Sequence, residues 1–208
     1  MDPIGAYEVL EMGEPLVTAR VAMIMVHGRG ASAPDILTLV PEIDRPGLAY
    51  LAPQAPGNAW YPYPFTSPID SNEPHLSDAL GALAQLLSRV EASVPSRRVI
   101  LLGFSQGACL TLEFAARNAR RFGGVIGLSG GLIGPDGTSR DYSGGFAGTP
   151  AFLGCSDVDP HIRKDRVLEA AEVLGRMGTS VTLRLYPGMG HVVSPDEIAA
   201  VREIVDSI

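Results

Sequence analysis

The stretch Arg98-Val-Ile-Leu-Leu-Gly-Phe-Ser-Gln-Gly107 decides the expected fold. Its apolar run predicts a buried strand, and the residues after Ser105 predict a helix to about Asn118. A G-x-S-x-G sequence between a strand and a helix is typical of a nucleophile elbow, because small flanking residues permit a sharp turn that exposes the serine hydroxyl. The start of the helix also offers amide donors beside that hydroxyl. The sequence therefore predicts a reactive Ser105 at the carboxyl end of a strand.

Strands and helices alternate on both sides of this stretch. Short runs rich in apolar and β-branched residues predict further strands at 21–26, 48–52, 124–128, 151–153 and 181–186. Most of these runs are continuous, as in parallel strands buried on both faces, whereas 181–186 alternates and fits a position nearer an edge. Apolar residues at three-to-four spacing predict helices at 76–90, 162–177 and, after a Ser194 cap, 195–208. We therefore expect a single α/β domain over residues 1–208, a doubly wound, mostly parallel sheet flanked by helices, without a large lid domain.

The composition excludes several classes of protein. Of 208 residues, 46% are hydrophobic and 19% charged, which fits a globular chain with a sizeable core. The net charge is −7 and the 16 basic residues are scattered, so we expect no nucleic-acid partner. No apolar run approaches the roughly 20 residues that span a bilayer.

Location and cofactors follow from the N-terminus and the cysteines. Met1-Asp-Pro-Ile-Gly5 lacks the basic and apolar regions of a secretory signal, so we expect a cytoplasmic protein. Cys109 and Cys155 are too few for a disulfide framework and show no metal-ligand spacing. We expect both thiols to be buried and reduced, and we expect neither a metal nor a cofactor.

A histidine loop follows the last predicted strand, at Pro187-Gly-Met-Gly-His191. An imidazole there can reach over a serine at a neighbouring strand end, in the chain order serine, acid, histidine. We therefore expect His191 to act as the general base for Ser105. The other histidines in polar, turn-rich surroundings are expected to be solvated: His75 and His161.

The acid that orients His191 should follow the strand at 151–153, where Asp157 and Asp159 are both candidates. We assign it to Asp157, which lies on the first turn of the loop after that strand. Asp159 precedes Pro160, which favours an extended conformation, so we expect it to start the helix at 162–177 or to face solvent.

The loop His27-Gly-Arg-Gly30 directly follows the strand at 21–26. In such a fold this loop supplies the second amide of an oxyanion hole, and its glycines let the backbone approach a substrate. We assign the oxyanion hole to the backbone amides of Arg29 and Gln106. We expect His27 to anchor the loop by hydrogen bonds, and the Arg29 side chain to be exposed or salt-bridged.

A proline-rich aromatic stretch, Trp60-Tyr-Pro-Tyr-Pro-Phe65, lies in the long connection after the strand at 48–52. A long loop at the carboxyl ends of strands is suited to wall a substrate pocket. Packing of these rings against the domain body is equally compatible with the sequence. The residues assigned to substrate binding are Trp60, Tyr61, Tyr63 and Phe65.

Four motifs together resemble the phospholipase/carboxylesterase family of small bacterial esterases related to acyl-protein thioesterases. They are His27-Gly-Arg-Gly30, Gly103-Phe-Ser-Gln-Gly107, Gly154-Cys-Ser-Asp157 and Gly188-Met-Gly-His191. The resemblance covers nearly the whole chain and implies an α/β-hydrolase fold with a triad of Ser105, His191 and Asp157. It also implies a carboxylesterase that cleaves small to medium-chain carboxylic esters and thioesters through an acyl-enzyme, with a small-molecule ester as its partner. The His-Gly-Arg-Gly form is more similar to bacterial members found beside aromatic-catabolism or hydroquinone-resistance genes than to the eukaryotic thioesterases.

Three alternatives compete with a carboxylesterase. One is an acyl-protein thioesterase or lysophospholipase. Another is a dienelactone-type hydrolase, although that family has cysteine as its nucleophile and this elbow holds Ser105. The third is a noncatalytic binding module of the same fold, which would generally lack a triad member. The sequence leaves open whether the chain forms a homodimer.

Overall fold

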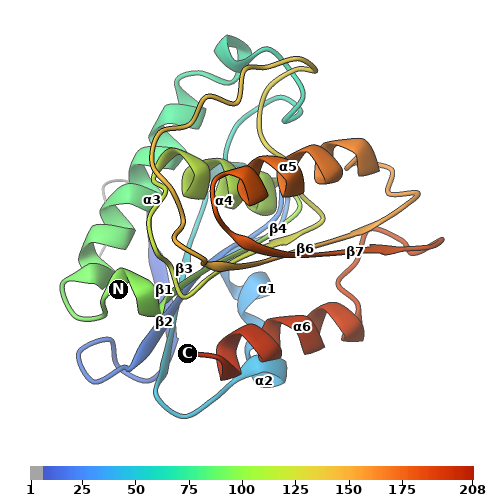
Figure 1. Ribbon diagram of the computed structural model, residues 1–208. Coiled ribbons are helices and arrows are strands. Elements are labelled where there is room, and N and C mark those ends of the chain that lie inside the picture. Colours follow the sequence, from blue (N-terminus) through green and yellow to red (C-terminus); the bar gives the residue numbers. More distant parts are fainter. Residues whose placement is uncertain (1–6) are drawn as a thin grey trace.

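The apolar runs of the sequence form the centre of one seven-stranded sheet in the computed structural model, which describes residues 7–208 (Figure 1). The N-terminal residues 1–5, on which the expected location depends, lie outside the described part. Within residues 7–208, no helix is both long and apolar enough to cross a bilayer.

The strand order across the sheet is β1-β3-β2-β4-β5-β6-β7. All neighbouring strands are parallel except β1, which pairs antiparallel with β3. The predicted runs all form strands, and the alternating run forms β7 at one edge. The strands are β1 (Val9–Gly13), β2 (Val21–Val26), β3 (Leu48–Pro53), β4 (Val99–Phe104), β5 (Gly124–Leu128), β6 (Pro150–Ser156) and β7 (Ser180–Tyr186).

Helices cover both faces of the sheet, which makes it doubly wound as expected (Figure 1). α3, α4 and α5 lie on one face, and α1, α2 and α6 lie on the other. The helices are α1 (Ala33–Leu37), α2 (Val40–Ile43), α3 (His75–Glu91), α4 (Gln106–Arg117), α5 (Lys164–Arg176) and α6 (Pro195–Asp206). Short 3₁₀ turns occupy Pro56–Asn58, Ile69–Asn72 and Ser96–Arg98.

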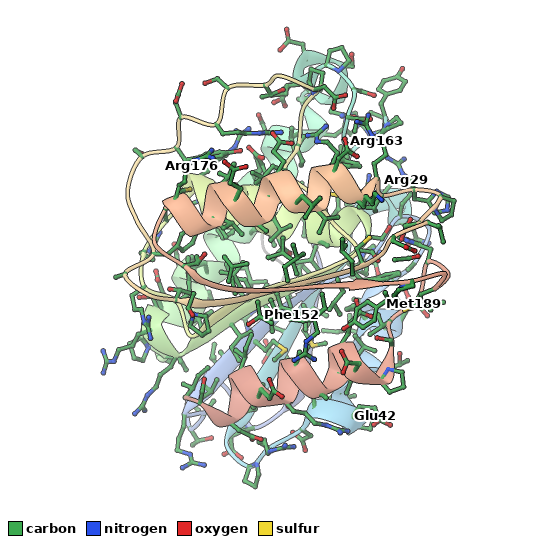
Figure 2. All side chains as sticks on the ribbon, turned by 45° about the vertical axis from the view of Figure 1, so that its right-hand side comes forward. Arg29, Glu42, Phe152, Arg163, Arg176 and Met189 are labelled. Atoms are coloured by element: carbon green, nitrogen blue, oxygen red, sulfur yellow. The ribbon has the colours of Figure 1, made fainter. Side chains whose placement is uncertain are left out.

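Strand β2 divides its side chains between two hydrophobic cores. Because successive side chains of a strand point to opposite faces, Ile24 packs in the core under α3 and α4, while Met23 and Met25 pack in the core above α2 and α6. Phe152 of β6 lies in the second core, between the sheet and α6 (Figure 2). Burial on both faces explains why the central strands appear as continuous apolar runs.

Helix α6 begins where the sequence predicts, whereas α5 begins later than predicted. α6 begins as predicted: the Ser194 side chain accepts a hydrogen bond from the Glu197 amide at 3.2 Å, and the Glu197 carboxylate accepts one from the Ser194 amide at 2.7 Å. α5 begins at Lys164, two residues later than the predicted start at Ile162. The residues before Lys164 are therefore free to belong to the loop that follows β6.

The turn from β4 into α4 packs against the end of β2 without room for a side chain. A Cβ atom on Gly107 would lie 2.1 Å from the Val26 carbonyl oxygen and 2.4 Å from that of His27. A Cβ on Gly103 would lie 2.3 Å from the Gly107 carbonyl oxygen. These two glycines therefore set how closely α4 approaches the central strands.

This packing predicts that Gly107→Ala is strongly destabilising. The added methyl meets backbone atoms that have little freedom to move, so we expect a loss of about 1–3 kcal/mol in the free energy of unfolding, measured by urea titration. Gly81→Ala is the matched control, because nothing lies within 4 Å of a Cβ at that position in α3. It should stabilise the protein by about 0.5–1 kcal/mol. A Gly107→Ala protein as stable as the parent would contradict the packing described.

Candidate active site

Ser105 occupies the turn between β4 and α4 in a strained backbone conformation. Its φ is 56° and its ψ is −121°, a region that residues other than glycine rarely adopt. The turn is held by hydrogen bonds from the Ser105 amide to the Leu128 carbonyl at 2.9 Å and from the Cys109 amide to the Ser105 carbonyl at 3.0 Å. Gly28 approaches from the β2 loop, since a Cβ there would lie 3.3 Å from the Ser105 Cβ. The surrounding structure thus fixes the position of the Ser105 hydroxyl.

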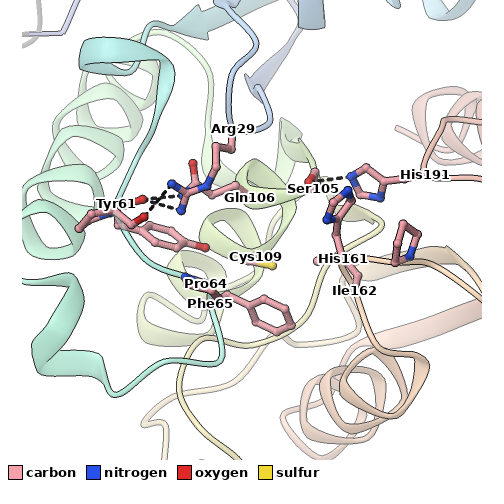
Figure 3. A pocket seen from close by; sticks show the side chains of 12 residues that line it. Arg29, Tyr61, Pro64, Phe65, Ser105, Gln106, Cys109, His161, Ile162 and His191 are labelled. Carbon is pink, nitrogen blue, oxygen red and sulfur yellow. Dashed lines mark hydrogen bonds between the residues drawn. The ribbon is translucent and has the colours of Figure 1, made fainter.

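A hydrogen-bonded chain runs from Ser105 through His191 to Asp159. The Ser105 Oγ lies 2.8 Å from the His191 Nε2 (Figure 3). The His191 Nδ1 lies 2.7 Å from the Asp159 Oδ2. Because a carboxylate can only accept, the Nδ1 carries the proton and the Nε2 is free to accept from the serine hydroxyl. The three residues follow β4, β7 and β6, so parallel strand ends bring them together.

The expectation that Asp157 contacts His191 is wrong. Asp157 is the first residue after β6, and its Oδ1 accepts a hydrogen bond from the Gly188 amide at 2.8 Å, at the start of the histidine loop. The chain then turns, so that Asp159 instead faces the imidazole. Ser156 also binds this loop, by donating a hydrogen bond to the Met189 carbonyl. Asp157 therefore ties the two loops together, and Asp159 meets the ring.

Asp159 is held as a buried carboxylate. Its side chain is fully buried, and its Oδ1 accepts from the amides of His161 at 2.8 Å and Ile162 at 2.9 Å. Burial raises the pKa of Asp159, but the hydrogen bonds from His191 and from these two amides outweigh burial and hold the pKa below its usual value. The stability that this ionised group contributes is present above its unfolded-state pKa and is lost as the pH falls through the folded-state pKa.

Two rings flank the His191 imidazole. The Phe104 ring lies at a centroid distance of 4.9 Å and a tilt of 34°, and the His161 ring lies at 4.9 Å in an edge-on arrangement of 74°. His161 is exposed, as expected, but it also lines the cavity beside His191, which the sequence analysis did not predict. The sequence carried no signal for this placement, because it depends on the turn in which Asp159 accepts from the amides of His161 and Ile162.

The backbone amides assigned to an oxyanion hole flank Ser105. Gln106 is the first residue of α4, so its amide has no acceptor within the helix. Among residues 7–208, neither the Arg29 nor the Gln106 amide donates a hydrogen bond to a protein acceptor. Two unused amides beside a reactive hydroxyl could stabilise a developing negative charge.

The side chains of Arg29 and Gln106 hold the aromatic loop. The exposed Arg29 guanidinium donates to the carbonyl oxygens of Tyr61 at 2.8 Å, Pro62 at 2.8 Å and Tyr63 at 3.0 Å. The Gln106 side chain accepts from the Trp60 amide at 3.0 Å and donates to the Tyr61 carbonyl at 2.8 Å. These bonds fix the loop at 60–63 against the turn that carries Ser105.

His27 anchors the β2 loop by hydrogen bonds, as the sequence predicted. Its Nδ1 lies 2.8 Å from the Gly28 carbonyl oxygen, and its Nε2 accepts from the Ala55 amide at 3.1 Å. The Trp60 indole donates to the His27 carbonyl at 2.8 Å. Burial lowers the pKa of His27, which favours the neutral ring with its proton on Nδ1.

A cavity of about 580 Å³ opens beside Ser105 (Figure 3). Of the four aromatic residues assigned to substrate binding, Tyr61 and Phe65 line this cavity. Trp60 and Tyr63 do not: Trp60 is buried against His27 and Tyr63 is exposed. The lining is completed by Arg29, Pro62, Pro64, Ser105, Gln106, Cys109, Pro160, His161, Ile162 and His191.

In the described part of the chain, residues 7–208, neither cysteine forms a disulfide or belongs to a cluster of metal-ligating side chains. Both Cys109 and Cys155 are free and buried, and burial raises the pKa of each thiol to about 12. Within residues 7–208, no three His, Cys, Asp or Glu side chains lie together in a way that could hold a metal ion.

Comparison with known proteins relates nearly the whole chain to one family. The family model described as Phospholipase/Carboxylesterase matches residues 8–208. A crystal structure of a phospholipase/carboxylesterase from Dyadobacter fermentans is similar at 40% identity and a TM-score of 0.92, over 96% of each chain. The acyl-protein thioesterase 1 of Candida albicans is 27% identical, over 92% of this chain and 93% of that protein. With the acyl-protein thioesterase 1 of Debaryomyces hansenii the identity is 29%, over 55% of this chain and only about half (50%) of the relative's length.

Proposed function

The chain belongs to the phospholipase/carboxylesterase family, and from that premise we propose that it is a serine carboxylesterase acting on small to medium-chain carboxylic esters and thioesters. The observation that carries the proposal is the hydrogen-bonded chain of Ser105, His191 and Asp159 at the edge of a cavity. A serine, a histidine and a carboxylate in this arrangement activate the serine hydroxyl as a nucleophile.

In the proposed mechanism, the Ser105 Oγ attacks the ester carbonyl carbon while its proton passes to the His191 Nε2. The Asp159 carboxylate stabilises the resulting imidazolium, and the amides of Arg29 and Gln106 bind the oxyanion. His191 then gives the proton to the leaving alcohol or thiol, which leaves an acyl group on Ser105. A water molecule then gives a proton to His191 and attacks the acyl carbon, the bond to the Ser105 Oγ breaks, and His191 returns the proton to that oxygen as the acid leaves.

A second candidate function is acyl-protein thioesterase activity, because the curated relatives quoted above carry that name. The cavity favours smaller substrates, since a space of about 580 Å³ must hold both sides of the ester. A noncatalytic binding module is disfavoured, because all three residues of the hydrogen-bonded chain are present.

The mechanism predicts opposite outcomes for two aspartates. Asp159→Asn should lower kcat by up to about 10⁴-fold, because an amide favours the wrong tautomer of His191. Asp157→Asn is the matched control and should stay within a few-fold, since the Asp157 side chain accepts from the Gly188 amide and does not contact the imidazole. Ser105→Ala should lower kcat by about 10⁴-fold or more. The assay is hydrolysis of p-nitrophenyl butyrate, and greater loss in Asp157→Asn than in Asp159→Asn would contradict the assignment.

Chain length separates the two candidate functions. We expect p-nitrophenyl esters of roughly two to eight carbons to be the better substrates, because each buried methylene adds about 0.8 kcal/mol only until the cavity ends. Palmitoyl esters and thioesters should give a clearly lower kcat/KM than butyryl ones. Faster turnover of the palmitoyl substrates would favour the acyl-protein thioesterase.

A further inference from the structure

The hydroxyl of Tyr61 is a buried polar group that makes no well-formed hydrogen bond in the fold. The Tyr61 side chain is 1% exposed, and its hydroxyl makes no hydrogen bond of normal geometry among residues 7–208. Tyr61 nevertheless lines the cavity beside Ser105, and its ring extends from the aromatic loop toward Cys109 (Figure 3). Buried hydroxyls nearly always have a partner, because leaving one unpaired is costly.

Within residues 7–208, the surroundings offer the Tyr61 hydroxyl only a weak partner, the Cys109 thiol. The Tyr61 backbone is held by the side chains of Arg29 and Gln106, which both donate to the Tyr61 carbonyl. The neighbouring Cys109 sulfur is a weak acceptor, and it already accepts from the Gly131 amide at 3.4 Å. Phe65 and Ile162, which line the same cavity, offer no polar side-chain atom.

We propose that the Tyr61 hydroxyl binds an oxygen atom of the substrate, so that the enzyme prefers esters carrying a neutral carbonyl or hydroxyl group away from the scissile bond. This inference rests on the proposed esterase function and deepens it. A site built to hydrogen-bond a substrate oxygen discriminates strongly against the analogue that lacks it, because the buried group is then left unpaired.

The charges near Tyr61 favour a neutral oxygen over an ion. Burial raises the pKa of Tyr61 well above its usual value, so the hydroxyl remains a donor at all working pH values. The nearby Arg29 donates to three loop carbonyls, and the nearby Glu113 is paired with Arg117 at 2.7 Å. A substrate ion buried at this end of the cavity would lose its hydration without a direct ion pair, because the Arg29 guanidinium is directed at the loop carbonyls.

The test compares ester pairs in which an oxygen replaces a methyl group of similar size. On the acyl side, the p-nitrophenyl esters of 4-oxopentanoate, 5-oxohexanoate and 6-oxoheptanoate are used. Each is paired with the p-nitrophenyl ester of 4-methylpentanoate, 5-methylhexanoate or 6-methylheptanoate, respectively. On the alcohol side, 3-oxobutyl and 4-oxopentyl butyrates are paired with 3-methylbutyl and 4-methylpentyl butyrates. The quantity measured is the ratio of kcat/KM within each pair, for the parent and for Tyr61→Phe.

We expect the ratio in at least one pair to fall by about tenfold or more in Tyr61→Phe, since the variant removes only the hydroxyl. Tyr63→Phe is the matched control from the same loop, because Tyr63 is 55% exposed and does not line the cavity. It should keep the parent ratios. The melting temperature of Tyr61→Phe should equal or exceed that of the parent, because the lost hydroxyl makes no well-formed internal hydrogen bond.

The outcomes separate this inference from the function on which it rests. Ratios that stay within threefold of the parent in every pair would overturn the role of Tyr61 and leave the esterase proposal standing. A clear fall in melting temperature, or failure of Tyr61→Phe to fold, would show that the hydroxyl serves the fold and would also overturn it. Parent protein that hydrolyses none of the esters would contradict the esterase proposal itself.

Discussion

The close approach of α4 to the end of β2 is the constraint on which the rest of the site depends. Gly107 lies against the carbonyls of Val26 and His27, where any side chain would collide with backbone. This contact brings the start of α4 beside the loop that carries Arg29 and forces Ser105 into a conformation with positive φ. The strain is offset by the hydrogen bond to Leu128 and by the buried packing of the helix. The serine hydroxyl is thereby held where the histidine loop can reach it.

Arg29 and Gln106 connect the catalytic turn to the wall of the cavity. In the proposed mechanism their backbone amides bind the oxyanion, while their side chains hold the loop at 60–63 through the Tyr61 carbonyl. The cavity wall therefore cannot shift without disturbing the residues that flank Ser105. This coupling gives a physical reason why a group on that wall, such as the Tyr61 hydroxyl, can contribute to the choice of substrate.

Much of this architecture follows from local patterns, and the failures have definite causes. Continuous apolar runs predicted the central strands because these strands are buried on both faces, whereas β1 was missed because only Val9 of its residues is buried. The meeting of Ser105 with His191 could be expected from neighbouring strand ends. The choice between Asp157 and Asp159 could not, because it depends on how the loop after β6 turns. That turn is set by the amides of His161 and Ile162, which bind the Asp159 carboxylate and aim it at the ring.

The central claim is that Ser105 is the nucleophile of an acyl-enzyme, and covalent trapping tests it most directly. The protein would be treated with a fluorophosphonate, and the adduct would be located by intact mass and peptide mapping. The account predicts one adduct per chain, on Ser105, and none in the folded Ser105→Ala protein. An adduct on another residue, or folded parent protein that stays unlabelled while it hydrolyses esters, would contradict the account.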